Sequence, residues 1–399
     1  MREAVILAGG AGTGIKVLTC GKPKVLLKIL GKAVIEYVLD ALLNIGIRRA
    51  VIITDKPREF ETITLKYGKV MEFEVRKQKG EGLIAALLTA ADELSKNALL
   101  VYGDTLMPTE GFRGVINAFQ TFNKPVITVV PEEDVSLYGA VTLTTDGRVR
   151  SFVEKPEKYV EGAYAFGGVA ILDEELVRLI ESEGSLDKAV NSYVRRYDMV
   201  ASIWSGWWVD VGYPWNVLEA QYYLFNEYVG NSIISRKARI ASTAIIEGPV
   251  VIEEGAQIDH YAVIKGPAYI GKNVLVGTHV FIRPYVGVGR DSTVSSYVEL
   301  VWSAIEPEAT IGRGTFLGFS VVGEKAVIES NVITELLTEP EREGIKAIKV
   351  VKKRKQYTKI GAFIGYRARV PAGKKLQPGE YVGGICNELR HRRLQRANK

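Results

Sequence analysis

The sequence contains few of the residues that mark a disulfide-stabilised, membrane-spanning or exported protein. Its 399 residues include two cysteines, Cys20 and Cys386, which stand far apart in the chain. This excludes a disulfide framework as the main source of stability and fits a reducing cytoplasm. No run of about 18 apolar residues occurs, so no membrane span is expected. The start of the chain lacks the long apolar stretch and the cleavage site of a signal peptide.

The charge is modest and unevenly distributed. The net charge is +6, and basic residues gather between Lys346 and Lys359 and in the tail from Arg390 to Lys399. A nucleic-acid surface is one interpretation of such clusters. No aromatic platform separates the charges, which favours a solvated loop and a solvated terminus. We therefore expect no nucleic-acid partner.

The first half of the chain alternates β-branched runs with amphipathic stretches, the pattern of parallel βαβ units. Strand-like runs on both sides of the turn Asp146-Gly147 then indicate a β-rich insertion. We expect an α/β domain with a Rossmann-like mixed sheet over residues 1–230. Its expected helices are Lys32–Leu43 and Leu83–Leu94, and its expected strands are Ala4–Ala8, Ala50–Thr54, Val70–Val75, Leu99–Tyr102, Val126–Val130, Ala140–Leu143, Val149–Val153, Tyr164–Leu172 and Met199–Trp204.

The second half repeats an aliphatic residue every six positions, which is typical of a parallel β-helix. The eleven positions are Ile240, Ile246, Ile252, Ile258, Ile264, Ile270, Val276, Ile282, Val288, Val294 and Leu300. The frame slips before Ile305 and returns at Ile364 after a charged interruption. We expect an all-β left-handed parallel β-helix over residues 231–399, with an inserted loop near residues 331–359.

The most informative local pattern runs from Leu7 to Lys16 and is followed by Pro23-Lys24. A strand-like run enters a glycine-rich loop whose backbone amides can approach phosphates closely. The glycine spacing fits neither the dinucleotide fingerprint nor the P-loop.

This segment resembles the opening pattern of the sugar-1-phosphate nucleotidylyltransferases, L-A-[AG]-G-x-G-[TS]-R-[LM]-x-P-L-T-x(3)-P-K. Further matches follow in the family's order, and with the hexapeptide repeat they cover nearly the whole chain. The layout is like that of the bifunctional N-acetylglucosamine-1-phosphate uridylyltransferase and its archaeal relatives. The matching segments are Gln78 with Gly82-Leu83, Gly103-Asp104, Tyr138-Gly139, Phe152-Val153-Glu154-Lys155-Pro156 and Trp208-Val209-Asp210-Val211-Gly212.

The resemblance implies transfer of a nucleoside monophosphate from a triphosphate, with UTP or dTTP favoured, to a sugar 1-phosphate with release of pyrophosphate. It implies Mg²⁺ at Asp104 and Asp210, and Lys24 and Lys16 as catalytic cations on the triphosphate. Nucleotide-binding residues would be Leu7, Ala8, Gly9, Gly10, Gly12, Thr13, Gln78, Gly82 and Gly103. Sugar-phosphate-binding residues would be Tyr138, Gly139, Glu154 and Lys155.

One departure from the family pattern leaves alternatives open. Gly14 stands where the family has an arginine that contacts the triphosphate, and Lys16 or Lys22 would replace it only as a point charge. An active enzyme is one hypothesis, and a catalytically impaired regulatory or assembly paralogue is the second.

A β-helix acyltransferase is the third hypothesis. The acetyltransferase motifs of the relatives are missing from residues 311–318 and 331–335. His279 is interpreted as a structural residue of a β-helix face. We therefore expect no acetyl transfer, and we expect the β-helix to form a homo-oligomer, a trimer as in relatives.

Overall fold

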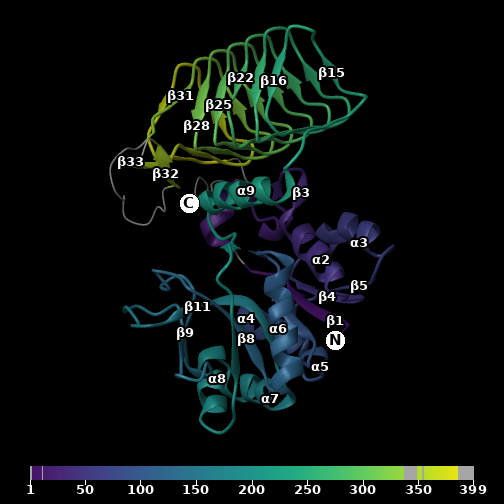
Figure 1. The fold of residues 1–399 in the computed structure, drawn as a ribbon, viewed down its shortest axis with the longest axis vertical. Helices are drawn as coiled ribbons and strands as arrows, with labels where there is room; N and C mark the ends of the chain where they lie inside the picture. The colour runs from purple at the N-terminus through teal and green to yellow at the C-terminus, as the bar shows by residue number, and fades with distance from the viewer. Residues whose placement is uncertain (1, 11, 337–347, 353–354, 385–399) are drawn as a thin grey trace, which may run out of the picture. The chain divides into compact units, whose positions relative to one another are not determined.

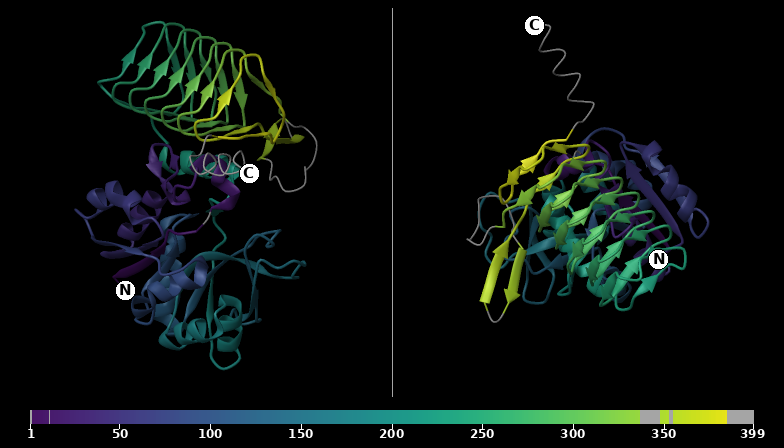
Figure 2. Two further views of the ribbon diagram at one scale, coloured as in Figure 1. Left: turned by 180° about the vertical axis from the view of Figure 1, so that it is seen from behind. Right: turned by 90° about the horizontal axis from the view of Figure 1, so that it is seen from above.

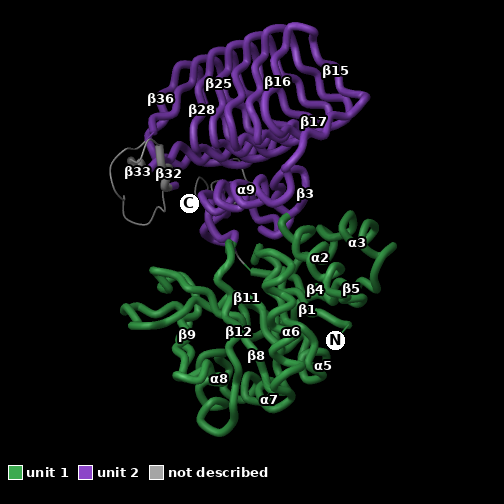
Figure 3. The backbone as a smooth tube through the Cα atoms, viewed as in Figure 1, with its two compact units in different colours: residues 1–11, 34–210 green, residues 12–33, 211–399 purple. Residues whose placement is uncertain are grey.

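The computed structural model describes residues 2–10, 12–336, 348–352 and 355–384, and the chain forms two compact units (Figure 3). The first unit comprises residues 1–11 and 34–210, and the second comprises residues 12–33 and 211–399. The second unit thus includes helix α9 (Pro214–Tyr228) and a short N-terminal segment in addition to the repeats. Among the described residues, no helix has both the length and the apolar character that a membrane crossing requires.

The first unit is built on a mixed sheet, as predicted (Figure 1). Its strands are β1 (Glu3–Leu7), β4 (Arg49–Thr54), β5 (Glu72–Lys77), β6 (Leu99–Tyr102), β8 (Val126–Val130), β9 (Gly139–Leu143), β10 (Val149–Glu154), β11 (Tyr164–Ile171) and β12 (Val200–Ile203). β6, β1, β4 and β5 are parallel neighbours, and β8 pairs in parallel with β12. The long strand β11 runs antiparallel to β6, β8 and β9, which makes the sheet mixed.

The helices of the first unit include four that the sequence patterns did not identify, which span Glu61–Tyr67, Thr109–Phe122, Glu174–Glu183 and Leu186–Val194. The unit's helices are α2 (Val34–Asn44), α3 (Glu61–Tyr67), α4 (Gly82–Thr89), α5 (Ala91–Leu94), α6 (Thr109–Phe122), α7 (Glu174–Glu183) and α8 (Leu186–Val194). The single helix expected over Leu83–Leu94 is two helices, because Ala90 leaves the helical conformation at φ −113° and ψ 21°. Helix α7 begins after Asp173, whose carboxylate accepts a hydrogen bond from the Leu176 N–H at 2.8 Å and so caps the helix.

The repeats of the second unit form three parallel sheets (Figures 1 and 2). The first sheet contains β14 (Ile233–Ile234), β17 (Val250–Ile252), β20 (Ala268–Ile270), β23 (Val286–Val288), β26 (Ala304–Ile305), β29 (Val321–Val322), β34 (Phe363–Ile364) and β37 (Tyr381–Val382). The second contains β15 (Arg239–Ile240), β18 (Gln257–Ile258), β21 (Leu275–Val276), β24 (Thr293–Val294), β27 (Thr310–Ile311), β30 (Val327–Ile328) and β35 (Arg369–Val370). The third contains β16 (Ile245–Glu247), β19 (Val263–Lys265), β22 (Phe281–Ile282), β25 (Glu299–Val301), β28 (Phe316–Gly318), β31 (Ile333–Thr334) and β36 (Lys375–Leu376).

The six-residue ladder forms the core of this β-helix, which confirms the predicted fold. Ile240 and Ile246 pack against the core from the first coil, and the other nine ladder residues are buried within it. The six-residue frame slips before Ile305 because the coil there is one residue shorter. Ile270 pairs with Val288, eighteen positions on, whereas Val288 pairs with Ile305, seventeen positions on. Each coil is stabilised by stacking on its neighbours, so a one-residue change is absorbed at a corner.

The segment expected to be a loop near residues 331–359 contains regular structure. Thr334 of β31 occupies a ladder position, pairs in register with Leu376 and is 2% exposed. Its hydroxyl accepts a hydrogen bond from the Gly318 N–H at 2.9 Å, which is why a polar residue is tolerated there. Farther on, β32 (Ile348–Lys352) and β33 (Lys355–Lys359) pair as an antiparallel hairpin. The predicted basic tail and Cys386 lie outside the described residues.

Candidate functional site

Two short strands bring the predicted metal carboxylates to adjoining positions. Strand β6 ends at Tyr102, Asp104 follows it, and β7 (Thr105–Leu106) pairs antiparallel with β13 (Val209–Asp210). In this register Asp210 stands opposite Thr105, one residue after Asp104. Residues paired across an antiparallel ladder lie about 5 Å apart, so the two aspartates are close although they are far apart in sequence.

Tyr102 links these aspartates to the predicted sugar side of the site. Desolvation raises the pKa of its hydroxyl well above the ordinary value, and the negative charges of Glu154, Asp104 and Asp210 add to the rise. All three carboxylates therefore act on one tyrosine hydroxyl. Desolvation also raises the pKa of Glu154, with repulsion from Asp187 adding to it and the charge of Lys155 opposing it. The site thus concentrates negative charge that a cation would stabilise.

The predicted nucleotide-binding residues of the first unit lie together at the end of β1. The Gly103 N–H donates to the Leu7 carbonyl at 2.9 Å, and the Ala8 N–H donates to the Ile53 carbonyl at 2.8 Å. A Cβ on Gly9 would lie 2.5 Å from Oε1 of Gln78, so a side chain there would collide with the glutamine.

Gln78 is itself held in place by the turn before α4. Its Nε2 donates to the Gly80 carbonyl at 3.2 Å and to the Gly82 carbonyl at 2.9 Å. Gly82 begins α4 and has a φ of +84°, a backbone conformation that glycine adopts without strain. Gly10 has a φ of +118°, and a Cβ there would meet no atom within 4 Å, which leaves its backbone open to a ligand.

The predicted sugar-phosphate residues share one edge formed by β9 and β10. Gly139 pairs with Glu154, and the Lys155 N–H donates to the Tyr138 carbonyl at 2.9 Å. Lys155 has a left-handed φ of +44°. This conformation is strained for a residue other than glycine, and such strained residues cluster at binding sites. The Tyr138 ring packs edge-on against Trp208, with ring centroids 5.0 Å apart.

Several residues that position this edge were not identified from the sequence. Asn191 of α8 makes two hydrogen bonds to the backbone of Phe152. Its Nδ2 donates to the Phe152 carbonyl at 2.7 Å, and its Oδ1 accepts from the Phe152 N–H at 3.0 Å. Gly168 of β11 has a φ of +75°, and a Cβ there would lie 2.4 Å from Oγ1 of Thr105. The pair Gly167-Gly168 inside a strand-like run was a usable signal of close backbone approach. Asn191 carried no sequence signal.

The remaining predicted residues belong to the second unit. Gly12 has a φ of +52° and lies beside Lys24, since a Cβ on Gly12 would be 3.7 Å from the Cβ of Lys24. Thr13 begins the 3-10 helix η1 (Thr13–Ile15), Lys16 begins α1 (Lys16–Thr19), and Lys24 begins the 3-10 helix η2 (Lys24–Leu26). The predicted catalytic lysines thus share a unit with the β-helix, and the predicted metal carboxylates belong to the other unit.

The donor set suits a metal that keeps part of its water shell. Among the described residues, no group of three or more histidine, cysteine, aspartate or glutamate side chains is placed to hold a metal ion. Two aspartates fit Mg²⁺, which binds proteins through one or two carboxylates and completes its octahedron with water and phosphate oxygens.

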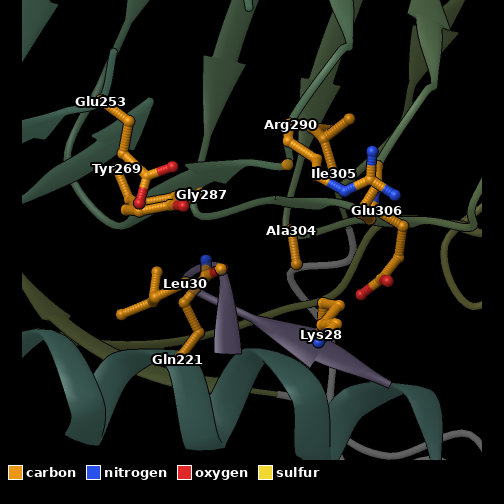
Figure 4. Close-up of a pocket in the computed structure, with 13 residues that line it drawn as sticks. Lys28, Leu30, Gln221, Glu253, Tyr269, Gly287, Arg290, Ala304, Ile305 and Glu306 are labelled. Atoms are coloured by element: carbon orange, nitrogen blue, oxygen red, sulfur yellow. The ribbon is translucent and has the colours of Figure 1, made fainter. Parts of the chain in front are cut away.

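A separate cavity of about 120 Å³ lies within the second unit (Figure 4). It is lined by α9, by the β-helix and by the hairpin of β2 (Lys28–Ile29) and β3 (Lys32–Ala33). Glu306, which is 6% exposed, points from the β-helix toward Lys28, whose backbone N–H bonds to it. Desolvation and the charge of Glu324 raise the pKa of Glu306 to about 8, opposed by Lys28 and Lys22. Arg290 also lines the cavity.

We expect Glu306→Gln to stabilise the protein at alkaline pH. Unfolding returns the carboxyl to a pKa near 4.5, so between pH 4.5 and 8 the folded protein holds a proton that the unfolded chain has released. The contribution of Glu306 to stability therefore falls as the pH rises through this window, by at most about 5 kcal/mol. Glutamine removes this loss and can still accept the Lys28 hydrogen bond.

Urea unfolding at pH 5, 6.5 and 8 measures the effect. The gain of Glu306→Gln over the parent protein should grow with pH. Glu174→Gln, which removes an exposed charge paired with Arg178 at 2.6 Å, is the control and should show no such growth. Parallel pH profiles for the parent protein and Glu306→Gln would contradict the buried neutral carboxyl.

A mixed sheet with two aspartates at adjoining strand ends, followed by a hexapeptide β-helix, defines the protein as a two-domain nucleotidyltransferase. The chain belongs to the nucleotidyl transferase family, whose model matches residues 3–227, and a bacterial transferase hexapeptide model of six repeats matches residues 249–284. These matches confirm the predicted family and the predicted type of enzyme.

Three curated relatives are similar to this chain. The bifunctional protein GlmU of Methanococcus maripaludis strain C7 is 31% identical over 393 residues, 96% of this chain and 92% of the relative. The bifunctional sugar-1-phosphate nucleotidylyltransferase/acetyltransferase of Sulfurisphaera tokodaii is 28% identical over 394 residues, 96% of this chain and 95% of the relative. The UTP–glucose-1-phosphate uridylyltransferase AglF of Haloferax volcanii is 26% identical over 237 residues, 56% of this chain and 97% of the relative.

Proposed function

We propose that the protein transfers a nucleoside monophosphate from a nucleoside triphosphate to a sugar 1-phosphate. An oxygen of the sugar phosphate attacks the α-phosphorus, and the bond to the β-phosphate breaks to release pyrophosphate. The observation that carries this proposal is the pairing of β7 with β13, which puts Asp210 opposite the residue that follows Asp104, with the charges of both aspartates and of Glu154 acting on Tyr102. The names of the relatives supply the substrate class.

The residues of the chain have separable roles in this proposal. The backbone from Leu7 to Gly10 binds the nucleotide, since Gly10 is exposed and has no side chain to keep a phosphate away. Lys155 neutralises the sugar phosphate, and Glu154 accepts hydrogen bonds from sugar hydroxyls. Mg²⁺ held by Asp104 and Asp210 would neutralise charge on the phosphate oxygens as pyrophosphate leaves. UTP or dTTP is the proposed donor, supported by Gln78 and by the name of the Haloferax relative.

A pyrophosphate-release assay tests this function. Each common nucleoside triphosphate is paired with a panel of hexose and hexosamine 1-phosphates in the presence of Mg²⁺. The assay is run at neutral pH, because we propose that the protein is cytoplasmic. Turnover with one pair supports the active enzyme and excludes the impaired paralogue. Binding of nucleotide without turnover by any pair would favour the paralogue.

Acetyl transfer is a second candidate, favoured by the name of the Sulfurisphaera relative, which spans 96% of this chain. We nevertheless keep the prediction that acetyl transfer is absent, and residues 311–318 support it. Ile311 and Leu317 are ladder residues, and the guanidinium of Arg313 lies over the Tyr297 ring, 5.2 Å from its centroid. No histidine occurs in that stretch to act as a base. Consumption of acetyl coenzyme A with a hexosamine phosphate would overturn the prediction.

We also propose a homo-oligomer, expected to be a trimer, that uses the face of the third sheet. One row of its outward positions is apolar except for Glu299, and Ile245 and Ile333 in this row are 50% and 46% exposed. Lys375 follows Ile333 in register, and the charged pair Glu247 and Lys265 occupies outward positions beside the row. The row is Ile245, Val263, Phe281, Glu299, Phe316 and Ile333. Such a row on a flat sheet favours burial against another chain. We expect Phe281→Glu to lower the mass measured in solution to that of the 44.0 kDa chain.

A further inference from the structure

The segment that carries the predicted catalytic lysines has little structure of its own. Residues 12–33 contain no helix or strand longer than four residues. Isolated elements this short are not stable in water, so their conformation depends on what they contact. The contacts that the structure gives them within the second unit are with the coils of the β-helix and with residues near α9.

The first anchor lies before Lys24 in the chain. The ammonium of Lys22 pairs with the Glu324 carboxylate at 2.8 Å and lies over the Tyr366 ring, 5.1 Å from its centroid. The Tyr366 N–H donates to the Val17 carbonyl at 2.9 Å. Gly365 permits this approach, because a Cβ there would lie 2.8 Å from the same carbonyl oxygen.

Glu324 is suited to hold a cation. It follows β29, and its side chain is 24% exposed. Desolvation disfavours its charge, but hydrogen bonds and charges from Lys22 and Lys325 outweigh this and lower its pKa. The carboxylate is therefore ionised at neutral pH and partly shielded from water, where an ion pair is stronger than on an open surface.

The second anchor lies after Lys24. The backbone N–H of Lys28 bonds to the buried Glu306. Gly31 sits on Tyr269 of β20 so closely that a Cβ would be 2.2 Å from the tyrosine hydroxyl. Lys24 thus lies between two points at which β-helix residues fix the chain.

From these contacts, and on the basis of the proposed function, we infer that the β-helix is a positioning element for nucleotidyl transfer. Glu324 acts through Lys22 as a positioning residue: it fixes the conformation of the segment that carries Lys16 and Lys24, the residues proposed to contact the triphosphate. Lys22 is accordingly an anchor rather than a replacement for the missing arginine. A small displacement of a charge that stabilises a transition state costs one to two orders of magnitude in rate.

The test removes the ion pair at Glu324 and compares it with a matched pair elsewhere. Glu324→Gln should expose the amides of residues 16–28 to faster hydrogen exchange and should lower kcat/KM for pyrophosphate release about tenfold. Glu254→Gln is the control, because Glu254 also pairs with two lysines, Lys237 at 2.9 Å and Lys272 at 2.5 Å, and both of these lie outside residues 12–33. The exchanged pair, Lys22→Glu with Glu324→Lys, should restore both readouts.

The two readouts separate this inference from the proposed function. Absence of turnover in the parent protein would reject the function, whereas hydrogen exchange would still decide whether Glu324 anchors the segment. If the exchange of residues 16–28 in Glu324→Gln equals that in Glu254→Gln, the anchor does not exist. If exchange rises but kcat/KM stays at the parent value, the positioning role is rejected.

Discussion

Asp104→Asn is expected to lower kcat for pyrophosphate release by on the order of 10³-fold, and Asp210→Asn by a similar factor. Each substitution keeps the shape of the side chain but removes one of two negative charges that the pairing of β7 with β13 brings together. With one carboxylate left, a hard cation loses charge compensation and a fixed ligand. The loss should be partly recovered at high Mg²⁺, so both variants should show a raised Mg²⁺ requirement.

A matched control separates this effect from general loss of negative charge in the first unit. Asp198→Asn removes a carboxylate that forms an ion pair with Arg148 and is half exposed, and it should retain parental kinetics. The double variant of Asp104 and Asp210 should be little worse than either single one, because the two residues act as a unit. Parental activity of Asp104→Asn at low Mg²⁺ would remove Asp104 from the metal site.

The sequence predicted the β-helix well because its signal is one of composition at a fixed period. Each ladder position requires the same thing, an aliphatic side chain directed inward, so Ile252 and Val294 could be assigned without any knowledge of their neighbours. Thr334 was not predicted as a ladder residue, because its hydroxyl accepts a hydrogen bond from the Gly318 N–H of the preceding coil. No local sequence pattern reports such a contact. Helix α6 also escaped, although its amphipathic spacing was a usable helical signal, because β-branched runs dominated the prediction for this half of the chain.

The residues of the candidate site could be predicted where their role depends on residues that are adjacent in the sequence. Gly9 lies two residues after β1 and Gly103 directly follows β6, and their roles could be proposed from a strand followed by glycine. Tyr102 and Asn191 could not be found in this way, since their importance comes from carboxylates and a strand edge that the fold brings to them. The division of predicted site residues between two compact units was equally invisible, because contacts across hundreds of residues, such as Lys22 with Glu324, define it.

The second large effect concerns Gly14, and we expect Gly14→Arg to lower the stability and activity of the protein rather than to improve them. A Cβ at this position would lie 2.7 Å from the Gly212 carbonyl oxygen and 2.7 Å from a ring carbon of Tyr213. Tyr213 cannot move aside easily, because it stacks on Trp215, which is 5% exposed, with ring centroids 4.6 Å apart and planes 5° apart. An arginine must therefore distort the loop, at a cost of about 2 kcal/mol in stability.

The measurement pairs thermal unfolding with the pyrophosphate-release assay. Gly14→Arg should lower Tm by about 5 °C and reduce kcat/KM at least tenfold, and Gly14→Ala should show the same directions because the collision begins at Cβ. Gly230→Arg is the control, since a Cβ on Gly230 meets no atom within 4 Å and its φ is not positive. Higher activity in Gly14→Arg would mean that the glycine is an eroded arginine. The packing indicates the opposite: Gly212 and Tyr213 occupy the space that the Cβ of any larger residue would need. Glycine at position 14 is therefore a requirement of the local structure and does not by itself indicate a lost activity.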